Sequence, residues 1–381
     1  MLIDDGPNVV LDLGSSSIKV GFNGESCPRF IIPNVIGKIK KDLIYIIEND
    51  NKSQFGNDAI YNSTLYNLDY YQINHNGKFP LENEGKDLED FLNYILFTKL
   101  KLKNDTNPGI FIITSILTNP IEKKFLCEIL FNKLNIRKIY MESQSVMTLY
   151  STAKTSGLII NSGEIINEIV PIYEGYVIQS GVKSCFKAGK ELTNQFLKFY
   201  DNYFNYFNVE NKFEMAKKIK EKYCEILPFN NNNNYNQINE EFILPDGNCI
   251  EISNERFDLP EIFFNSNGCD NHSLQEIISE SIDKTDLMFR KYFYNNIILG
   301  GGNSCIKGFP ERLKSEIENY LKVNNNKIDV KKIDMTNSSE RQYSAWIGAS
   351  GVCSFNNFKT KWLYKENYAE NGAQHLIDDF I

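Results

Sequence analysis

The sequence is poor in the residues that build metal centres and disulfide frameworks. It has three histidines, and its eight cysteines are scattered without any C-x-x-C spacing. We therefore expect neither a zinc site nor a disulfide framework, and reduced intracellular thiols fit this cysteine usage better. Long apolar runs are also missing. The stretch from Ile110 to Leu117 is among the longest, yet it has only the length of a strand.

Signals for export and for binding to polyanions are missing as well. The N-terminal stretch MLIDDGPN lacks the basic region and the apolar core of a signal peptide. Acidic residues number 49 against 41 basic ones, and the net charge of −8 argues against general binding to nucleic acid or anionic membranes. From 381 residues we expect about two or three domains. The expectation is a soluble intracellular protein with no direct membrane binding, which meets nucleic acid only indirectly.

Strand-like and helix-like segments alternate along the chain, which is typical of an α/β architecture. Short apolar runs between Gly-rich turns predict strands over 9–13, 18–22 and 29–32, and β-branched runs predict strands over 109–115 and 139–141. Helical periodicity and start signals predict helices over 86–102, 120–134, 145–152 and 212–224. The low-complexity run around Asn230 predicts a solvated loop.

The most informative feature is an internal repeat. VVLDLGSSSIKVGF (9–22) and LIINSGEIINEIVPI (158–172) share one design: an apolar strand, a polar end residue, a Ser/Gly turn and an apolar return strand. A turn of this kind presents consecutive backbone N–H groups that can hold an anion, so two such hairpins could clamp a polyphosphate. A third Gly-rich turn, ILGGGNSCIKGF from Ile297, follows a strand and could make room for a base or ribose. Each turn alone is weak evidence, but the ordered set indicates a nucleotide site.

Three longer blocks resemble actins: VPIYEGY (170–176), LPDGNCIEISNERFDLPEIFF (244–264) and SSERQYSAWIGASGVCSFNNFKTKWLYKENYAENG (338–372). On these blocks the chain is identified as a member of the actin and actin-related protein family, within the actin-like ATPases. The resemblance covers nearly the whole chain and implies two lobes, each with a duplicated sheet-and-helix core, around a central nucleotide cleft. It implies a small lobe of residues 1–150 and 345–381, with an outer subdomain (34–76) and its divergent tip loop, and a large lobe of residues 151–344.

The resemblance also implies ATP or ADP as ligand, with Mg²⁺, for which Ca²⁺ can substitute in vitro. It implies that Asp12 reaches the metal through water and that Lys19 contacts the phosphates. Other expected nucleotide contacts on the two hairpins are Gly14, Ser15, Ser16, Ser17, Ser162, Gly163, Glu164 and Ile165. Those expected around ribose and base are Gly189, Lys217, Lys220, Glu221, Gly301, Gly302, Asn303 and Cys305.

The residues that serve hydrolysis in the family are kept only in part. Gln144 matches the water-orienting glutamine, but Asn161 stands in place of an acid and Glu168 in place of a histidine. Ile165 also replaces a glycine that allows close approach of phosphate. Hydrolysis depends on placing one water in line with the γ-phosphate, so we expect ATP binding with weak or absent turnover. A role for Glu168 as substitute base is the alternative.

The contacts of the actin filament are altered too. Lys361 aligns with a position in a mostly apolar cleft, and burying its charge there would be costly. The stretch from Phe264 to His272 is shorter than in actin, and the C-terminal HLIDDFI is acidic. We therefore expect a non-polymerising scaffold subunit of a multiprotein complex, either cytoskeletal or nuclear and chromatin-remodelling. Its partners would be other subunits, with actin or another actin-related protein among the candidates.

Two readings of function stay open. Large insertions, which some chromatin-associated relatives carry, are missing from this sequence, and this favours the cytoplasm and cytoskeleton, with the nucleus as the alternative location. A divergent filament-forming cytoskeletal ATPase is the alternative function.

Overall fold

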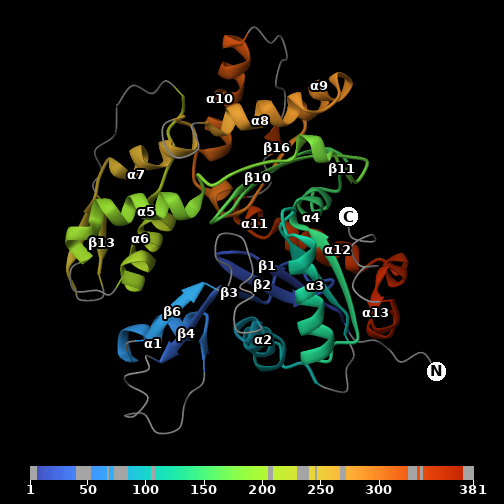
Figure 1. The fold of residues 1–381 in the computed structure, drawn as a ribbon. Helices are drawn as coiled ribbons and strands as arrows, with labels where there is room; N and C mark the ends of the chain where they lie inside the picture. The colour runs from blue at the N-terminus through green and yellow to red at the C-terminus, as the bar shows by residue number, and fades with distance from the viewer. Residues whose placement is uncertain are drawn as a thin grey trace. The chain divides into compact units, whose positions relative to one another are not determined.

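The computed structural model (Figure 1) describes residues 7–39, 53–66, 68–72, 85–103, 108–204, 209–229, 240–244, 247–266, 272–324, 333–334 and 338–371. The chain divides into two compact units. The first joins Met1–Ala153 to Tyr343–Ile381, and the second is Lys154–Gln342. The loop around Asn230, most of the expected tip loop and the acidic C-terminus lie outside the described residues.

The first unit is built on a six-stranded sheet of order β17-β8-β7-β1-β2-β3, and a three-stranded sheet of order β5-β4-β6 forms its outer part. Its strands are β1 (Val9–Leu13), β2 (Ser17–Phe22), β3 (Phe30–Pro33), β4 (Val35–Ile39), β5 (Gln54–Phe55), β6 (Leu68–Gln72), β7 (Ile110–Thr114), β8 (Lys138–Ser143) and β17 (Leu363–Tyr364). Its helices are α1 (Asn57–Tyr66), α2 (Lys86–Asn93), η3 (Tyr94–Lys99), α3 (Pro120–Glu128), η4 (Ile129–Lys133), α4 (Gln144–Tyr150), α12 (Ser344–Cys353), η9 (Asn356–Lys361) and α13 (Lys365–Asn371).

The second unit is built on a sheet of order β11-β10-β9-β15-β16, with β12 also paired to β10, and on a separate β13–β14 hairpin. Its strands are β9 (Gly157–Ser162), β10 (Asn167–Tyr173), β11 (Tyr176–Val177), β12 (Lys183–Cys185), β13 (Glu240–Ile243), β14 (Cys249–Ile252), β15 (Ile297–Gly300) and β16 (Ile333–Asp334). Its helices are η5 (Gln179–Gly181), α5 (Gly189–Tyr200), η6 (Asp201–Phe204), α6 (Val209–Tyr223), α7 (Glu255–Asp258), η7 (Leu259–Phe263), α8 (Leu274–Asp283), α9 (Leu287–Asn295), η8 (Gly302–Cys305), α10 (Phe309–Val323) and α11 (Ser338–Arg341).

The two main sheets repeat one topology. In the first unit β1 pairs antiparallel with β2 and parallel with β7, which in turn pairs parallel with β8. In the second unit β9 pairs antiparallel with β10 and parallel with β15, which pairs parallel with β16. The repeat found in the sequence is thus a repeat of structure, and it places one Ser/Gly hairpin at the corresponding point of each sheet.

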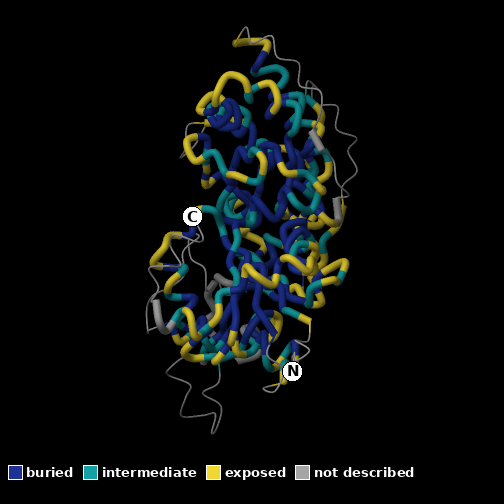
Figure 2. Tube along the Cα trace, turned by 90° about the vertical axis from the view of Figure 1, so that its right-hand side faces the viewer, coloured by how far each residue is buried: buried dark blue, intermediate teal, exposed yellow. Residues whose placement is uncertain are grey.

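Each unit has its own apolar core. Every residue of β1, β7 and β9 is buried, as expected for central parallel strands covered on both faces. Figure 2 shows the buried residues gathered in the interior of each unit. The C-terminal segment is tied into the first unit by α12, where the buried Trp346 donates its indole N–H to the carbonyl of Val10 at 3.0 Å. At Gly348 a Cβ would lie 1.9 Å from the Met147 carbonyl oxygen, so only glycine allows α12 to pack this closely on α4.

One helix ends earlier than its periodicity predicts. The helix expected over 86–102 is α-helical to Asn93 and continues as the π-turn η3 to Lys99, because Lys101 (φ 55°) takes a left-handed backbone conformation that stops a helix. The helix expected over 120–134 runs through α3 and η4 to Lys133, and Asn135 (φ 53°) ends it close to the predicted residue. The return strand of the second hairpin also starts at Asn167 rather than Ile165, because Gly163 N–H donates to the Ile166 carbonyl and closes a turn first.

Candidate functional site

The first hairpin places an acid and a base opposite each other. Asp12 on β1 and Lys19 on β2 are direct neighbours in the ladder, and Lys19 Nζ lies 3.3 Å from Asp12 Oδ2. Asp12 is 2 % exposed, and apart from this ion pair its Oδ2 accepts no hydrogen bond from the described residues. Lys19 offsets the charge of the buried carboxylate, and a hydrated cation bound there would share the carboxylate with this lysine.

The turn of this hairpin presents unused donors. The backbone N–H groups of Gly14 and Ser15, together with the hydroxyls of Ser15 and Ser17, have no hydrogen-bond partner among the residues the structure describes. At Gly14 a Cβ would lie 2.6 Å from the Ser17 carbonyl oxygen and 2.9 Å from Lys19 Nζ, so the tight turn requires glycine. Free amides, hydroxyls and a lysine in one turn suit a phosphate group.

The second hairpin offers donors of one kind. Gly163 N–H donates to the Ile166 carbonyl at 3.0 Å, but the N–H groups of Glu164, Ile165 and Ile166 have no acceptor within the described part of the chain. Three consecutive amides of this kind form an anion-holding concavity. Ile165, which stands where the family has glycine, is buried and does not take a left-handed backbone conformation, so the turn accepts it without strain.

The side chains of the second hairpin are bonded within their own unit. The Ser162 hydroxyl donates to Asn167 Oδ1 at 2.5 Å, and Asn303 Nδ2 donates to Ser162 Oγ at 3.1 Å and to the Gly163 carbonyl at 2.6 Å. Lys220 Nζ lies 3.2 Å from Glu164 Oε2 and donates to the Gly189 carbonyl at 3.0 Å. These bonds leave little side-chain capacity for a ligand.

Charge fixes the ionisation of Glu164. Burial alone would raise the pKa of this carboxyl, but the ammonium groups of Lys220 and Lys217 outweigh burial and hold the pKa below its usual value. Glu164 is therefore ionised at neutral pH and paired. Lys220, expected to contact ribose and base, has two of its three donors engaged by the protein. Lys217 is half-buried and Glu221 is exposed on the same helix α6.

The third glycine turn packs directly on the second hairpin. Gly301 (φ +83°) has a backbone that disfavours other residues, and a Cβ there would lie 2.3 Å from the Ser162 carbonyl oxygen. Its own N–H donates to the Arg341 carbonyl. A Cβ on Gly302 would meet nothing within 4 Å, so this face of the turn is open. Nearby, burial raises the pKa of the Cys305 thiol, which excludes a reactive thiolate at neutral pH.

A protein-family model described as Actin matches residues 3–379, which is nearly the whole chain. The chain belongs to the actin family. This match and the duplicated mixed sheets together show an actin-like α/β fold. Members of the actin family generally bind ATP or ADP with a divalent metal.

The donor set fits such a ligand. Among the described residues no group of three or more His, Cys, Asp or Glu side chains could hold a metal by itself. Mg²⁺ typically takes one or two carboxylates and fills its other positions with waters and phosphate oxygens, and Asp12 offers such a carboxylate. None of the helices in the described ranges has the length and apolarity needed to span a membrane.

The positions that serve hydrolysis in the actin family are found on both units. Asn161 and Glu168 face each other directly across the β9–β10 ladder, and both are buried. Gln144 begins α4 and is half-buried, and its side chain has no hydrogen-bond partner within the described ranges. Asn161 thus leaves an amide where this family has an acid, directly opposite the carboxylate of Glu168.

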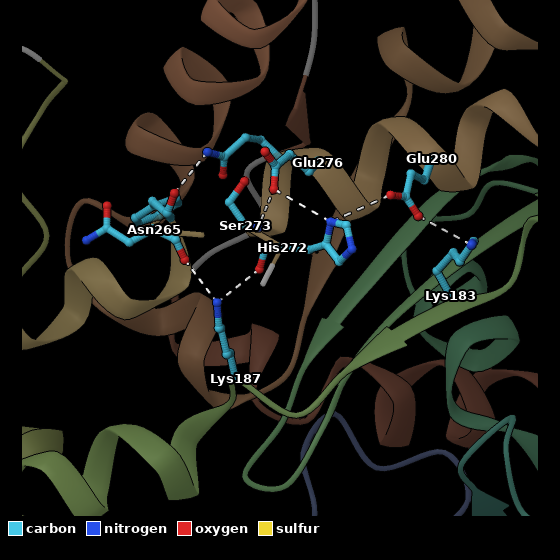
Figure 3. A network of polar contacts seen from close by, with 9 residues as sticks. Lys183, Lys187, Asn265, His272, Ser273, Glu276 and Glu280 are labelled. Atoms are coloured by element: carbon cyan, nitrogen blue, oxygen red, sulfur yellow. Dashed lines mark hydrogen bonds and ion pairs between the residues drawn. The ribbon is translucent and has the colours of Figure 1, made fainter. Parts of the chain in front are cut away.

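Sequence reasoning missed three residues. Asn34, 3 % exposed, donates from Nδ2 to the Gly14 carbonyl at 3.1 Å and from its N–H to the Ser16 carbonyl, so it braces the first turn. Its position directly after β3, the strand that pairs with β2 of the hairpin, was the available signal. Lys187, also buried, is bonded within the second unit (Figure 3).

The third is Glu142, on β8 two residues before Gln144. Its carboxylate accepts from the Tyr140 hydroxyl at 3.2 Å and from Ser143 N–H at 2.8 Å. Burial raises the pKa of Glu142 in spite of these bonds. The sequence signal for it was an acidic residue within the short strand KIYMES, next to the apolar Met141.

Proposed function

We propose that this actin-family chain is a nucleotide-binding scaffold subunit that does not polymerise on its own and turns over ATP slowly or not at all. The observation that carries the proposal is the contrast between the two hairpins. The first keeps Asp12, Lys19 and free donors for Mg-ATP, while the second has the amide of Asn161 opposite Glu168. Binding donors are thus kept, and the acid and imidazole that support water attack are replaced.

Bound Mg-ATP would supply a polyphosphate and a divalent cation. The free amides of each turn suit phosphate, and at the first turn Lys19 would add a compact positive charge. The Asp12 carboxylate would hold the cation through water, which is the arrangement Mg²⁺ favours. Asn161 carries no charge at neutral pH, so it attracts the metal less than an acid and cannot accept a proton from water.

The surface that would have to meet another copy supports the second half of the proposal. Lys361, at the end of η9, is exposed and makes no ion pair with another described residue. Burying this ammonium against an apolar segment without an acid would cost several kcal/mol, on the order of the net energy of one filament contact. Phe355, 69 % exposed at the other end of η9, adds apolar surface that a partner could cover.

The partners are proposed to be subunits of a larger assembly, with actin or another actin-related protein among the candidates. We favour a cytoskeletal assembly in the cytoplasm over a chromatin-remodelling one in the nucleus. Purification of the tagged protein under mild conditions, followed by identification of the co-purifying chains, tests the assembly and its compartment.

The function itself is tested by incubating the purified protein with Mg-ATP at concentrations where actin forms filaments. We expect it to stay in the supernatant on ultracentrifugation and to release little phosphate. The matched variant is Asn161→Asp combined with Glu168→His, which restores the family residues and should raise phosphate release without causing assembly. Helical filaments of the unmodified protein, with phosphate release that tracks assembly, would instead establish the alternative, a divergent filament-forming cytoskeletal ATPase.

A further inference from the structure

Lys187 is a buried cation held by neutral groups. It lies between β12 and α5 and is 5 % exposed, and its ammonium donates to the main-chain carbonyls of Asn265 at 3.1 Å and His272 at 3.2 Å (Figure 3). No acidic side chain within the described residues forms an ion pair with it. Breaking either hydrogen bond would leave the buried ammonium without one of its acceptors and the carbonyl without its donor, which is costly. The two bonds therefore hold the side chain of Lys187, and with it the backbone of this residue, in place.

The backbone of Lys187 is the first link in a chain of hydrogen bonds with one direction. The carbonyl of Lys187 accepts from Asn167 Nδ2 at 2.6 Å. Since a carbonyl can only accept, the amino side of the Asn167 amide must face it, and Oδ1 must face the second hairpin. There Oδ1 accepts the proton of the Ser162 hydroxyl at 2.5 Å.

The chain ends on the turn that carries the free amides. With its proton committed to Asn167, Ser162 Oγ accepts from Asn303 Nδ2 at 3.1 Å, and the same amino group donates to the Gly163 carbonyl at 2.6 Å. Gly163 is the residue whose N–H closes the turn onto Ile166. Each step fixes the donor–acceptor sense of the next, so reversal of any one amide would leave a buried pair of like groups.

We propose that Lys187 is a positioning residue for phosphate binding at the second hairpin, acting through Asn167, Ser162 and Asn303. Its ammonium secures the main chain at 265 and 272, and its carbonyl sets the orientation of the amides that shape the turn at 163–166. The proposal rests on the proposed nucleotide-binding function and adds to it a link between the hairpin and the surface around the N-terminus of α8. By reciprocity, a partner that binds at 265 or 272 would change phosphate affinity, and nucleotide would change partner affinity.

Lys183 is a matched control. It lies four residues before Lys187, and both lysines precede α5 in the chain. Its ammonium, however, forms a surface ion pair with Glu280 at 3.4 Å (Figure 3). The side chains of this pair are 32 % and 44 % exposed. Loss of an exposed pair has little effect, so Lys183→Met removes a lysine without touching the chain of bonds.

The experiment measures affinities of the full chain for Mg-ATP and for adenosine by calorimetry. We expect Lys187→Met to weaken Mg-ATP binding about tenfold and to leave adenosine binding unchanged, since only the phosphates meet the hairpin amides. Lys183→Met should bind both as the unmodified protein does. Asn167→Ala should reproduce the tenfold loss, and adding Lys187→Met to it should cause no further loss, because both break one chain.

A second readout needs no ligand. Gly189 N–H donates to the Gly163 carbonyl and Lys190 N–H to the Glu164 carbonyl, so both amides report on the shape of the turn. Their hydrogen exchange should be faster in Lys187→Met and in Asn167→Ala than in Lys183→Met. If the unmodified protein binds no Mg-ATP, the proposed function fails, and this exchange measurement alone decides the link.

Several outcomes overturn the proposal. Equal losses of ATP and adenosine affinity would show a general structural role for Lys187. Additive effects of the two substitutions, or unchanged exchange at Gly189 and Lys190, would show that the bonds do not act as one chain. Should Lys187→Met fail to fold, Asn167→Ala tests the same chain from its middle, and an unchanged Mg-ATP affinity in that variant also overturns it.

Discussion

The two Ser/Gly hairpins have one backbone design and opposite uses of their side chains. In the first, Lys19 and Asp12 pair with each other, and the Ser15 and Ser17 hydroxyls are free within the described structure. In the second, Ser162 and Glu164 are bonded to residues from the third turn and from α6. Both keep free backbone amides in the turn.

The difference shows how a duplicated site can divide its tasks. Amide donors come from the backbone and survive substitution, so both hairpins remain suited to phosphate. Side chains are free to change, and those of the second hairpin now hold the second unit together. We therefore expect substitutions in the second hairpin to affect mainly stability without ligand, and those in the first to affect mainly ligand binding.

The largest effect is expected from breaking the buried pair of the second hairpin. Lys220→Met leaves the Glu164 carboxylate buried without its cation, which should lower the free energy of unfolding by about 3–5 kcal/mol. Chemical denaturation of the ligand-free protein at pH 7 measures this loss. Adding Glu164→Gln to Lys220→Met should restore much of it, because no uncompensated charge remains.

The pH dependence of this loss follows from the lowered pKa of Glu164. A carboxyl whose pKa is lower in the folded than in the unfolded state stabilises the fold at pH values above its unfolded-state pKa, near 4.5. This stability is lost as the pH falls through the folded-state pKa. The gap between the unmodified protein and Lys220→Met should therefore narrow below pH 4.5. Lys212→Met, which breaks an ion pair whose Asp201 partner is exposed, is the control and should cost at most about 1 kcal/mol. If Lys220→Met and Lys212→Met lower the free energy of unfolding by similar amounts, the expectation that side chains of the second hairpin mainly serve stability is wrong.

The next effect in size concerns the first hairpin. Lys19→Met removes the compact charge beside the phosphate turn and should weaken Mg-ATP binding roughly a hundredfold. Thermal unfolding is measured for each protein with and without millimolar Mg-ATP. In Lys19→Met, Mg-ATP should raise the unfolding temperature much less than it does in the unmodified protein. Lys38→Met, which breaks a pair with Asp87 outside the hairpin, should keep the full shift. If the unmodified protein itself shows no shift, the nucleotide proposal is wrong.

The sequence predicted the backbone of both hairpins and the family, but not their side-chain bonding. Apolar runs and Ser/Gly turns are local patterns, so the strands and the duplication could be derived from them. The partners of Ser162 could not, because Asn303 lies 141 positions away and reaches it only through the parallel pairing of β9 with β15. The resemblance likewise assigned Lys220 to the ligand, while its bond to Glu164 depends on the packing of α6.

One helix end was the other failure. Periodicity predicted a helix to residue 102, but the left-handed backbone at Lys101, which ends it earlier, is not set by the apolar pattern. Glycine is the usual sequence signal for such an end, and position 101 has a lysine. The buried Asn34 and the half-buried Glu142 were missed for the same reason that distant partners were: burial depends on tertiary packing.

The smallest expected effect tests Glu142, a half-buried acid of the first unit, against the buried Glu164 of the second. Burial raises the pKa of Glu142, whereas nearby lysines lower that of Glu164. Because the pKa of Glu142 is higher in the folded state, ionising this carboxyl costs more in the folded than in the unfolded protein. Its contribution to stability is therefore complete below the unfolded-state pKa, near 4.5, and is lost as the pH rises through the folded-state pKa. Glu142→Gln cannot ionise and keeps the shape of the side chain. It should match the unmodified protein at pH 4 and exceed it by about 1 kcal/mol at pH 8 in denaturant unfolding. Glu366→Gln, at an exposed pair with Arg137, should show no such trend with pH. A Glu142→Gln variant that is less stable at pH 8 would mean that the ionised carboxylate of Glu142 stabilises the folded protein. Glu142 and Glu164 would then both stabilise the fold in their ionised form, which contradicts the expected difference.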